Sequence, residues 1–239
     1  MRQKKDENHA MKIHMSAGYH DNPLHRKRLQ TWLSHLNENL GKPRFIAVES
    51  NEVLFQVVIR NQRINFVALA REDEVLQKID RVLLQKLAKA ISYEADTHLD
   101  VFQSEGRIVW LDNARQDFST VCDPCTIATR YLKRCRTAIL DAQLELTPYL
   151  REHLLFEAID AVFVKQMANT ETESQAISTG ACDRDRAWMT LLRDFIPDKG
   201  HSDYGIVIVG ADHSQNEPDY LRYLLSEAGH DCEVRSLSS

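Results

Sequence analysis

Histidine and glutamate side chains follow apolar segments of this chain, at points where a buried strand would end. His213 is the last residue of the stretch GADH, which directly follows the apolar run IVIV, and Glu49 follows the run RFIAV. His20 comes two residues after Gly18, behind the run KIHMSA. Imidazole and carboxylate groups bind divalent transition metals, and without a metal they accept and donate protons. These three side chains are therefore candidate metal ligands, and Glu49 and His213 are also candidate catalytic groups.

A second polar cluster lies in the stretch YEADTH, residues 93–98. If a helix ends before it, the cluster becomes a loop that can reach the same site, and Asp96 and His98 become further candidate metal ligands. The alternative is a polar helix end in which Asp96 caps the next turn. Both interpretations stay open on the sequence alone.

Arginines in the stretch RDRAWMTLLRD, residues 184–194, offer planar guanidinium groups for a carboxylate or a phosphate. Arg186 and Arg193 lie two helical turns apart and share one face, so one of them can point toward a site on the sheet. We expect that arginine to stabilise an oxyanion or to hold an anionic substrate group. The alternative is a helix face that is simply solvated.

The order of apolar runs and helix-like segments predicts how these residues are positioned. Strands and helices alternate at both ends of the chain, which indicates an α/β fold with a mixed or parallel sheet flanked by helices. Ligands gather at the carboxyl ends of the strands in such a sheet, so the candidate residues would meet at one edge. We expect strands over 12–17, 44–48, 107–111, 205–209 and 232–237, and helices over 24–40, 67–94, 124–143, 147–168, 184–196 and 219–228.

The same pattern predicts the domain organisation. Residues 1–11 are polar and charged, and we expect a disordered tail there. Residues 12–239 are expected to form a single α/β domain, with a mostly helical insertion at about 113–200. A single CxxC pair at 122–125 lacks the second pair that a zinc ribbon needs, and we expect it to begin a helix.

Composition argues against several classes of function. The chain has 239 residues, 43% hydrophobic and 27% charged, as ordinary globular proteins do. A net charge of -5 argues against a nucleic-acid partner, and the lack of an apolar run of about 18 residues argues against a membrane partner. The N-terminal sequence has no apolar signal core, and the five scattered cysteines do not form a disulfide pattern, so we expect a cytoplasmic protein.

The segment IVIVGADHSQNEPDYLRYLLSEAGHDCEV resembles the C-terminal part of the TraB/Tiki/GumN family, which is related to the erythromycin esterase-like and ChaN-like proteins. That superfamily carries a Gly-x-x-His motif near each end of its domain, and GADH, which contains His213, matches the second motif. RFIAVESNE, which contains Glu49, resembles the strand that carries the family's glutamate, and RDRAWMTLLRD is similar to its Arg-rich helix. The first motif departs from the pattern, because AGYH places the glycine one position late before His20.

The resemblance implies a metal-dependent hydrolase that acts on an ester or amide bond of a small molecule or peptide. His20, Glu49 and His213 would then bind a divalent ion such as Mn, Co or Zn or act as the base. Arg193 or Arg186 would stabilise the oxyanion. Two alternatives stay open: a non-catalytic module that binds heme or another ligand, and a degenerate scaffold that acts through protein contacts.

Overall fold

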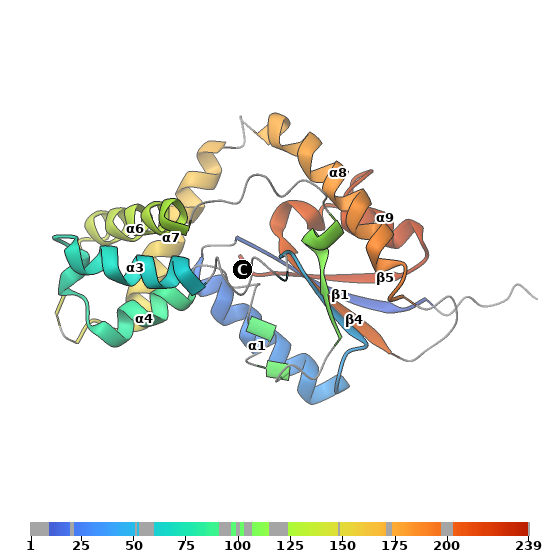
Figure 1. Cartoon of the computed structure of the whole chain (residues 1–239), viewed down its shortest axis with the longest axis horizontal. Helices are drawn as coiled ribbons and strands as arrows, with labels where there is room; N and C mark the ends of the chain where they lie inside the picture. Colours follow the sequence, from blue (N-terminus) through green and yellow to red (C-terminus); the bar gives the residue numbers. More distant parts are fainter. Residues whose placement is uncertain are drawn as a thin grey trace, which may run out of the picture.

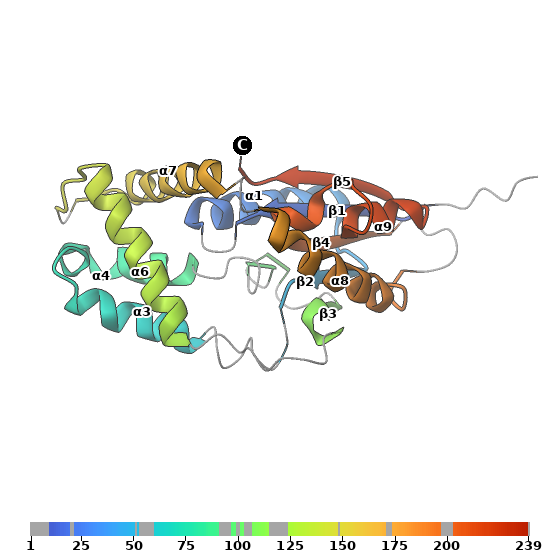
Figure 2. The same cartoon turned by 90° about the horizontal axis from the view of Figure 1, so that it is seen from above.

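The molecule consists of a sheet with helices on both faces and a lobe of helices beside it (Figure 1 and Figure 2). The structure is a computed structural model. It describes residues 10–19, 22–50, 52, 60–90, 97–98, 101–102, 107–114, 124–147, 149–170, 174–196 and 203–238. Most of the expected tail at 1–11 lies outside the described residues, as do His20, Asp96 and Cys122.

A sheet of five described strands forms the centre of the fold, in the order β3-β2-β4-β1-β5. Every pairing in it is parallel, which confirms the expected α/β class. Gly18 at the end of β1 lies opposite Gly210 at the end of β4, so the segments that follow both strands leave from the same edge. The strands are β1 (Lys12–Gly18), β2 (Phe45–Val48), β3 (Ile108–Trp110), β4 (Tyr204–Gly210) and β5 (Asp231–Ser236).

Helices cover both faces of the central strand β4. Ile206 and Ile208 are buried with leucines of α1, whereas Val207 and Val209 are buried with residues of α8 and α9. Because successive side chains of a strand point to opposite faces, a strand covered on both sides needs an unbroken apolar run such as IVIV. The helices are α1 (Pro23–Leu40), α3 (Arg60–Glu72), α4 (Arg81–Lys89), α6 (Pro124–Asp141), α7 (Glu152–Thr170), α8 (Ser174–Leu192) and α9 (Leu221–Glu227).

Helix α1 begins and ends where the sequence predicts. The Asn22 side chain accepts hydrogen bonds from the backbone N–H groups of Leu24 and His25, and Pro23 occupies the first turn. Gly41 follows the last turn with a φ of 75°, a conformation that glycine adopts at little cost.

A lobe made of α3, α4, α6 and α7 has an apolar core of its own. Phe66 and Tyr131 are fully buried in it, with ring centroids 5.1 Å apart. This lobe differs from the insertion expected at 113–200, because α3 and α4 precede that range and α8 packs on the sheet through Trp188 and Leu192. Within the described part of the chain, none of the helices has both the length and the apolar character needed to cross a membrane.

The single helix expected over 67–94 is wrong, since α3 ends at Glu72 and α4 begins at Arg81. Two aspartates explain the break. The side chain of Asp73 accepts the backbone N–H groups of Val75 and Leu76 in the intervening turn, and Asp80 caps the start of α4. Aspartate competes in this way with the regular backbone hydrogen bonds of a helix, whatever the apolar stripe around it predicts.

Candidate functional site

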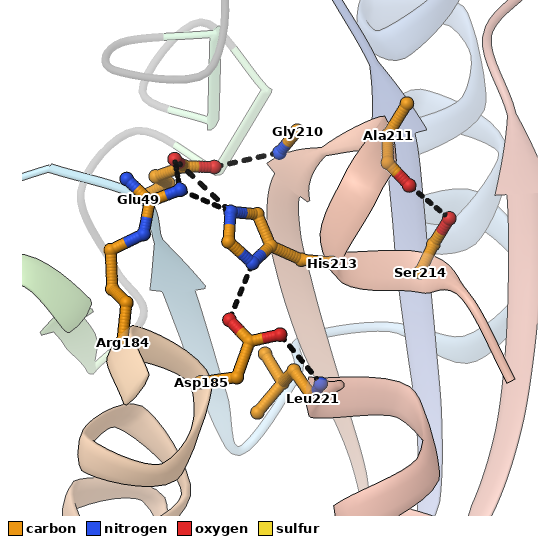
Figure 3. Close-up of polar contacts among 8 residues, drawn as sticks. All are labelled: Glu49, Arg184, Asp185, Gly210, Ala211, His213, Ser214 and Leu221. Carbon is orange, nitrogen blue, oxygen red and sulfur yellow. Dashed lines mark hydrogen bonds and ion pairs between the residues drawn. The ribbon is translucent and has the colours of Figure 1, made fainter. Parts of the chain in front are cut away.

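Glu49 and His213 meet at the carboxyl edge of the sheet, as Figure 3 shows. Glu49 directly follows β2, and its backbone N–H still donates to the carbonyl oxygen of Ile208 on β4, over 3.1 Å. His213 lies in the short helical turn η5 (Ala211–Ser214) behind β4. Its Nε2 is 3.5 Å from Oε1 of Glu49, and both side chains are at least 95% buried, with exposures of 2% and 5%. The structure therefore brings together two of the candidates that the strand order predicts at one edge.

Glu49 also connects the two strand ends. Its Oε2 accepts the backbone N–H of Gly210 over 2.7 Å, at the last residue of β4. One carboxylate oxygen thus binds the backbone at the first residue of the GADH turn, and the other oxygen faces the imidazole of His213. Figure 3 shows this division between the two oxygens.

Asp185, which was not among the candidates from the sequence, holds the other ring nitrogen of His213. Its Oδ1 accepts a hydrogen bond from Nδ1, and its Oδ2 accepts the backbone N–H of Leu221 over 2.8 Å. The Asp185 side chain is fully buried on α8. Because an acceptor on Nδ1 requires a proton there, Asp185 sets both the tautomer and the orientation of the ring.

Arg184 brings a permanent positive charge to Nε2. Its guanidinium contacts Nε2 of His213 and lies 3.0 Å from Oε1 of Glu49. The same group stacks over Trp188, with its carbon 4.8 Å from the ring centroid. Arg184, Glu49, Asp185 and His213 form a four-residue cluster. With 26% of its side chain exposed, Arg184 is the one member with substantial access to solvent. A substrate would therefore meet the cluster through Arg184.

The arginines chosen from the sequence do not face this cluster. Arg186 is exposed and forms ion pairs with Asp219 at 2.8 Å and with Asp183 at 3.4 Å. Arg193 is exposed just after the end of α8. The reason is the helical rotation of about 100° per residue, which turns Arg184 and Asp185 inward and Arg186 outward. One signal was present in the sequence, because positions 184, 185, 188 and 192 share the apolar face of α8.

The other expected metal ligands are not gathered at this edge in the described residues. His20 and Asp96 lie outside the described residues. His98 is buried beside Trp110, in an edge-to-face arrangement with ring centroids 6.3 Å apart. Within the described ranges, no group of three or more His, Cys, Asp or Glu side chains has the arrangement of a metal site.

The protonation of His213 depends on its burial and on two carboxylates. Burial by itself lowers the pKa of His213, but its hydrogen bonds to Asp185 and Glu49 outweigh burial and raise the pKa to about 9. Burial raises the pKa of Asp185, and the bond to His213 works against that rise. When the ring is protonated, two cations balance two carboxylates, so the imidazolium form is favoured at neutral pH.

Nε2 of His213 has a partner in each protonation state. With a proton, Nε2 donates toward Oε1 of Glu49; without it, the lone pair accepts a hydrogen bond from Arg184. Gain or loss of the proton at Nε2 therefore exchanges one partner for the other, since the imidazolium donates to Glu49 and the neutral ring accepts from Arg184. The cluster is therefore suited to acid–base chemistry at Nε2.

Comparison of the chain with models of protein families, with curated proteins and with solved structures found no match. The resemblance to the TraB/Tiki/GumN family therefore rests only on the motifs around Glu49, Arg184 and His213.

Proposed function

We propose that this protein hydrolyses an ester or amide bond, with His213 as the group that takes up and returns the proton. The observation that carries this proposal is the buried pair of Asp185 and His213, which leaves Nε2 directed at Glu49 and Arg184. In hydrolases where a carboxylate holds Nδ1, it is Nε2 that exchanges protons with the nucleophile and the leaving group.

The first step is attack of water on the carbonyl carbon. This step needs the neutral form of His213, which becomes the major form only as pH rises through its pKa of about 9. Neutral Nε2 then removes a proton from the water as the water oxygen bonds to the carbonyl carbon, and the carbonyl electron pair moves onto oxygen. The resulting imidazolium is stabilised by Asp185, in the same way that this carboxylate raises its pKa in the resting protein. The imidazolium then donates its proton to the leaving oxygen or nitrogen while the bond to carbon breaks, which restores the neutral ring.

Arg184 stabilises the negative charge that develops on the carbonyl oxygen. Its guanidinium lies at Nε2 and is partly exposed, so it can donate to a substrate oxygen without leaving Glu49. The 3.0 Å contact with Glu49 holds the guanidinium in place before substrate arrives. A donor fixed in advance stabilises a transition state more than a mobile one does.

The described residues do not fit a divalent metal at this position. A carboxylate on Nδ1 is the usual support for a metal-bound imidazole, and in that respect the cluster resembles a metal site. However, the guanidinium of Arg184 lies against both Nε2 and Oε1, where the ion would have to bind. A fixed cation at that place opposes a second one, so we favour the metal-free reaction.

Hydrolysis of a panel of p-nitrophenyl esters and peptide anilides by the full chain tests the proposal. We expect turnover that EDTA does not abolish, and His213→Gln should lower kcat/KM by about a hundredfold or more. His35→Gln is the matched control, because His35 is exposed on α1 and should leave kcat/KM unchanged.

Three results would contradict the proposal. A folded His213→Gln variant with normal turnover would remove His213 from the reaction. Activity that appears only after addition of Mn, Co or Zn would favour the metal-dependent reaction that the family resemblance implies. No turnover of any ester or amide by the folded chain would leave the cluster as a structural connection between α8 and the sheet.

A further inference from the structure

A pocket of about 670 Å³ lies between α1, α7 and the edge strand β5. Its volume is in the range of pockets that bind small organic molecules. None of the four residues of the cluster around His213 lines it. Arg235 belongs to the last part of β5, so the pocket lies toward the carboxyl end of that strand, where α/β proteins commonly bind ligands.

The wall of this pocket carries a concentrated positive charge. Lys27 and Arg28 contribute from α1 and Arg235 from β5, while among the described residues of the lining Glu157 supplies the one carboxylate. This gathering contrasts with the net charge of -5 of the whole chain. Cations that line a concave surface raise the local concentration of anions, and a bound anion relieves the repulsion between them.

Arg28 is fixed in place before any ligand binds. Its guanidinium donates to the backbone carbonyl of Leu237 over 2.6 Å, which connects α1 to the segment after β5. Lys27 has a long contact of 4.0 Å with Glu152, and its side chain is 61% exposed, so its ammonium remains accessible to an anion. The pocket therefore combines one preorganised cation with accessible ones.

Two aromatic side chains contribute apolar surface to the same pocket. Phe156 of α7 is 5% exposed, and Trp32 of α1 is half-buried. Aromatic rings offer large contact area to a planar ligand body. The combination of aromatic and cationic side chains in one lining corresponds to a ligand that is apolar at one end and anionic at the other.

We propose that this pocket binds a small organic anion. Its carboxylate or phosphate contacts Lys27, Arg28 and Arg235, and its planar apolar part packs on Trp32 and Phe156. The proposal is independent of the hydrolase function, since the two sites share no residue.

Calorimetric titration of the full chain with phenyl phosphate and benzoate tests the proposal, with benzyl alcohol and inorganic phosphate as the incomplete ligands. We expect saturable binding of at least one aromatic anion, about tenfold tighter than either incomplete ligand. The double variant Lys27→Gln/Arg235→Gln should weaken that binding about tenfold. Both side chains are exposed, so the fold should persist.

The double variant Arg71→Gln/Arg81→Gln is the matched control. It removes the same charge from another basic groove, between α3 and α4, where Arg71 and Arg81 are also exposed. We expect it to leave the affinity within about twofold of that of the unchanged chain. Equal loss in both double variants, no loss in either, or no saturable binding of both aromatic anions would overturn the proposal. Inorganic phosphate that binds as tightly as phenyl phosphate would overturn the role of the aromatic surface.

Discussion

Two histidines of this protein are almost fully buried next to an aspartate, yet their pKa values move in opposite directions. His213, with Asp185 and Glu49, has its pKa raised to about 9. His25 at the start of α1 lies near Asp160, and burial, which Asp160 only partly offsets, lowers its pKa to about 4. Both rings are at most 2% exposed, so burial alone does not explain the difference.

The hydrogen bonds of the two rings explain it. Nδ1 of His25 accepts the backbone N–H of Tyr19 over 2.9 Å, and Nε2 is 3.6 Å from Asp160, too far for a good hydrogen bond. The Asp160 oxygen instead accepts from the Asn22 side chain over 2.6 Å. His25 therefore stabilises the start of α1 as a neutral ring, whereas His213 has carboxylates on both nitrogens. A buried histidine becomes an acid–base group only when its partners accept the proton's charge.

The largest expected difference between the two histidines is catalytic. His213→Gln should lower kcat/KM by about 10²-fold to 10⁴-fold, because the ring that transfers the proton is lost. His25→Gln should leave kcat/KM within about threefold, since the polar partners of His25, Tyr19 and Asp160, do not belong to the cluster around His213. Steady-state kinetics on esters checks both variants, with circular dichroism as the measure of folding. Equal losses of kcat/KM in the two variants would contradict a catalytic role that is specific to His213.

Removal of the charge of Asp185 should lower the free energy of unfolding more than removal of the charge of Asp160. Asp185→Asn leaves a buried cation without its main partner, and we expect about 3–5 kcal/mol less free energy of unfolding. Asp160→Asn should cost about 1 kcal/mol, because the 20% exposed side chain loses its charge but its amide oxygen can still accept the hydrogen bond from Asn22. Urea unfolding measures both. NMR titration of the ring should also show a lower pKa for His213 in Asp185→Asn, and an unchanged pKa would contradict the role of Asp185.

The free energy of unfolding should fall at high pH because of His213 and at low pH because of His25. The pKa of His213 is raised on folding, so its contribution is complete below about 6.5 and is lost as pH rises through about 9. The pKa of His25 is lowered, so its contribution is complete above about 6.5 and is lost as pH falls through about 4. Each effect is on the order of 3 kcal/mol. Urea unfolding from pH 4 to pH 9.5 checks this, and each Gln variant should remove one window only.

The smallest expected effect is that of Arg186, which lies two residues from Arg184 on α8. Arg186→Gln should change the free energy of unfolding by less than about 0.5 kcal/mol, because its ion pairs with Asp183 and Asp219 are exposed. Arg184→Gln should lower kcat/KM by about tenfold to a thousandfold, because it removes the donor for the oxyanion. Kinetics and urea unfolding of both variants sharpen the contrast. Equal kinetic effects would show that the rotation of α8 does not select Arg184.

Much of the architecture is encoded locally, and local patterns predicted it. The runs IVIV and FIAV are apolar without interruption because both faces of β2 and β4 are covered, and such runs predict buried parallel strands. Asn22, Pro23 and Gly41 mark the ends of α1 through their own backbone preferences. Parallel strands end at one edge, so the positions of Glu49 and His213 behind them predicted a common edge, whereas the contact between them also depends on β2 and β4 being neighbours in the sheet.

Tertiary structure decided what surrounds those two residues. Arg184 rather than Arg186 faces His213 because of how α8 is rotated on the sheet, and that rotation depends on where Trp188 packs. No spacing along the chain distinguishes His25 from His213, since the charge of each ring depends on carboxylates that come from other elements. Residue types and periodicity follow from neighbours in the chain, whereas burial and electrostatics depend on neighbours in space.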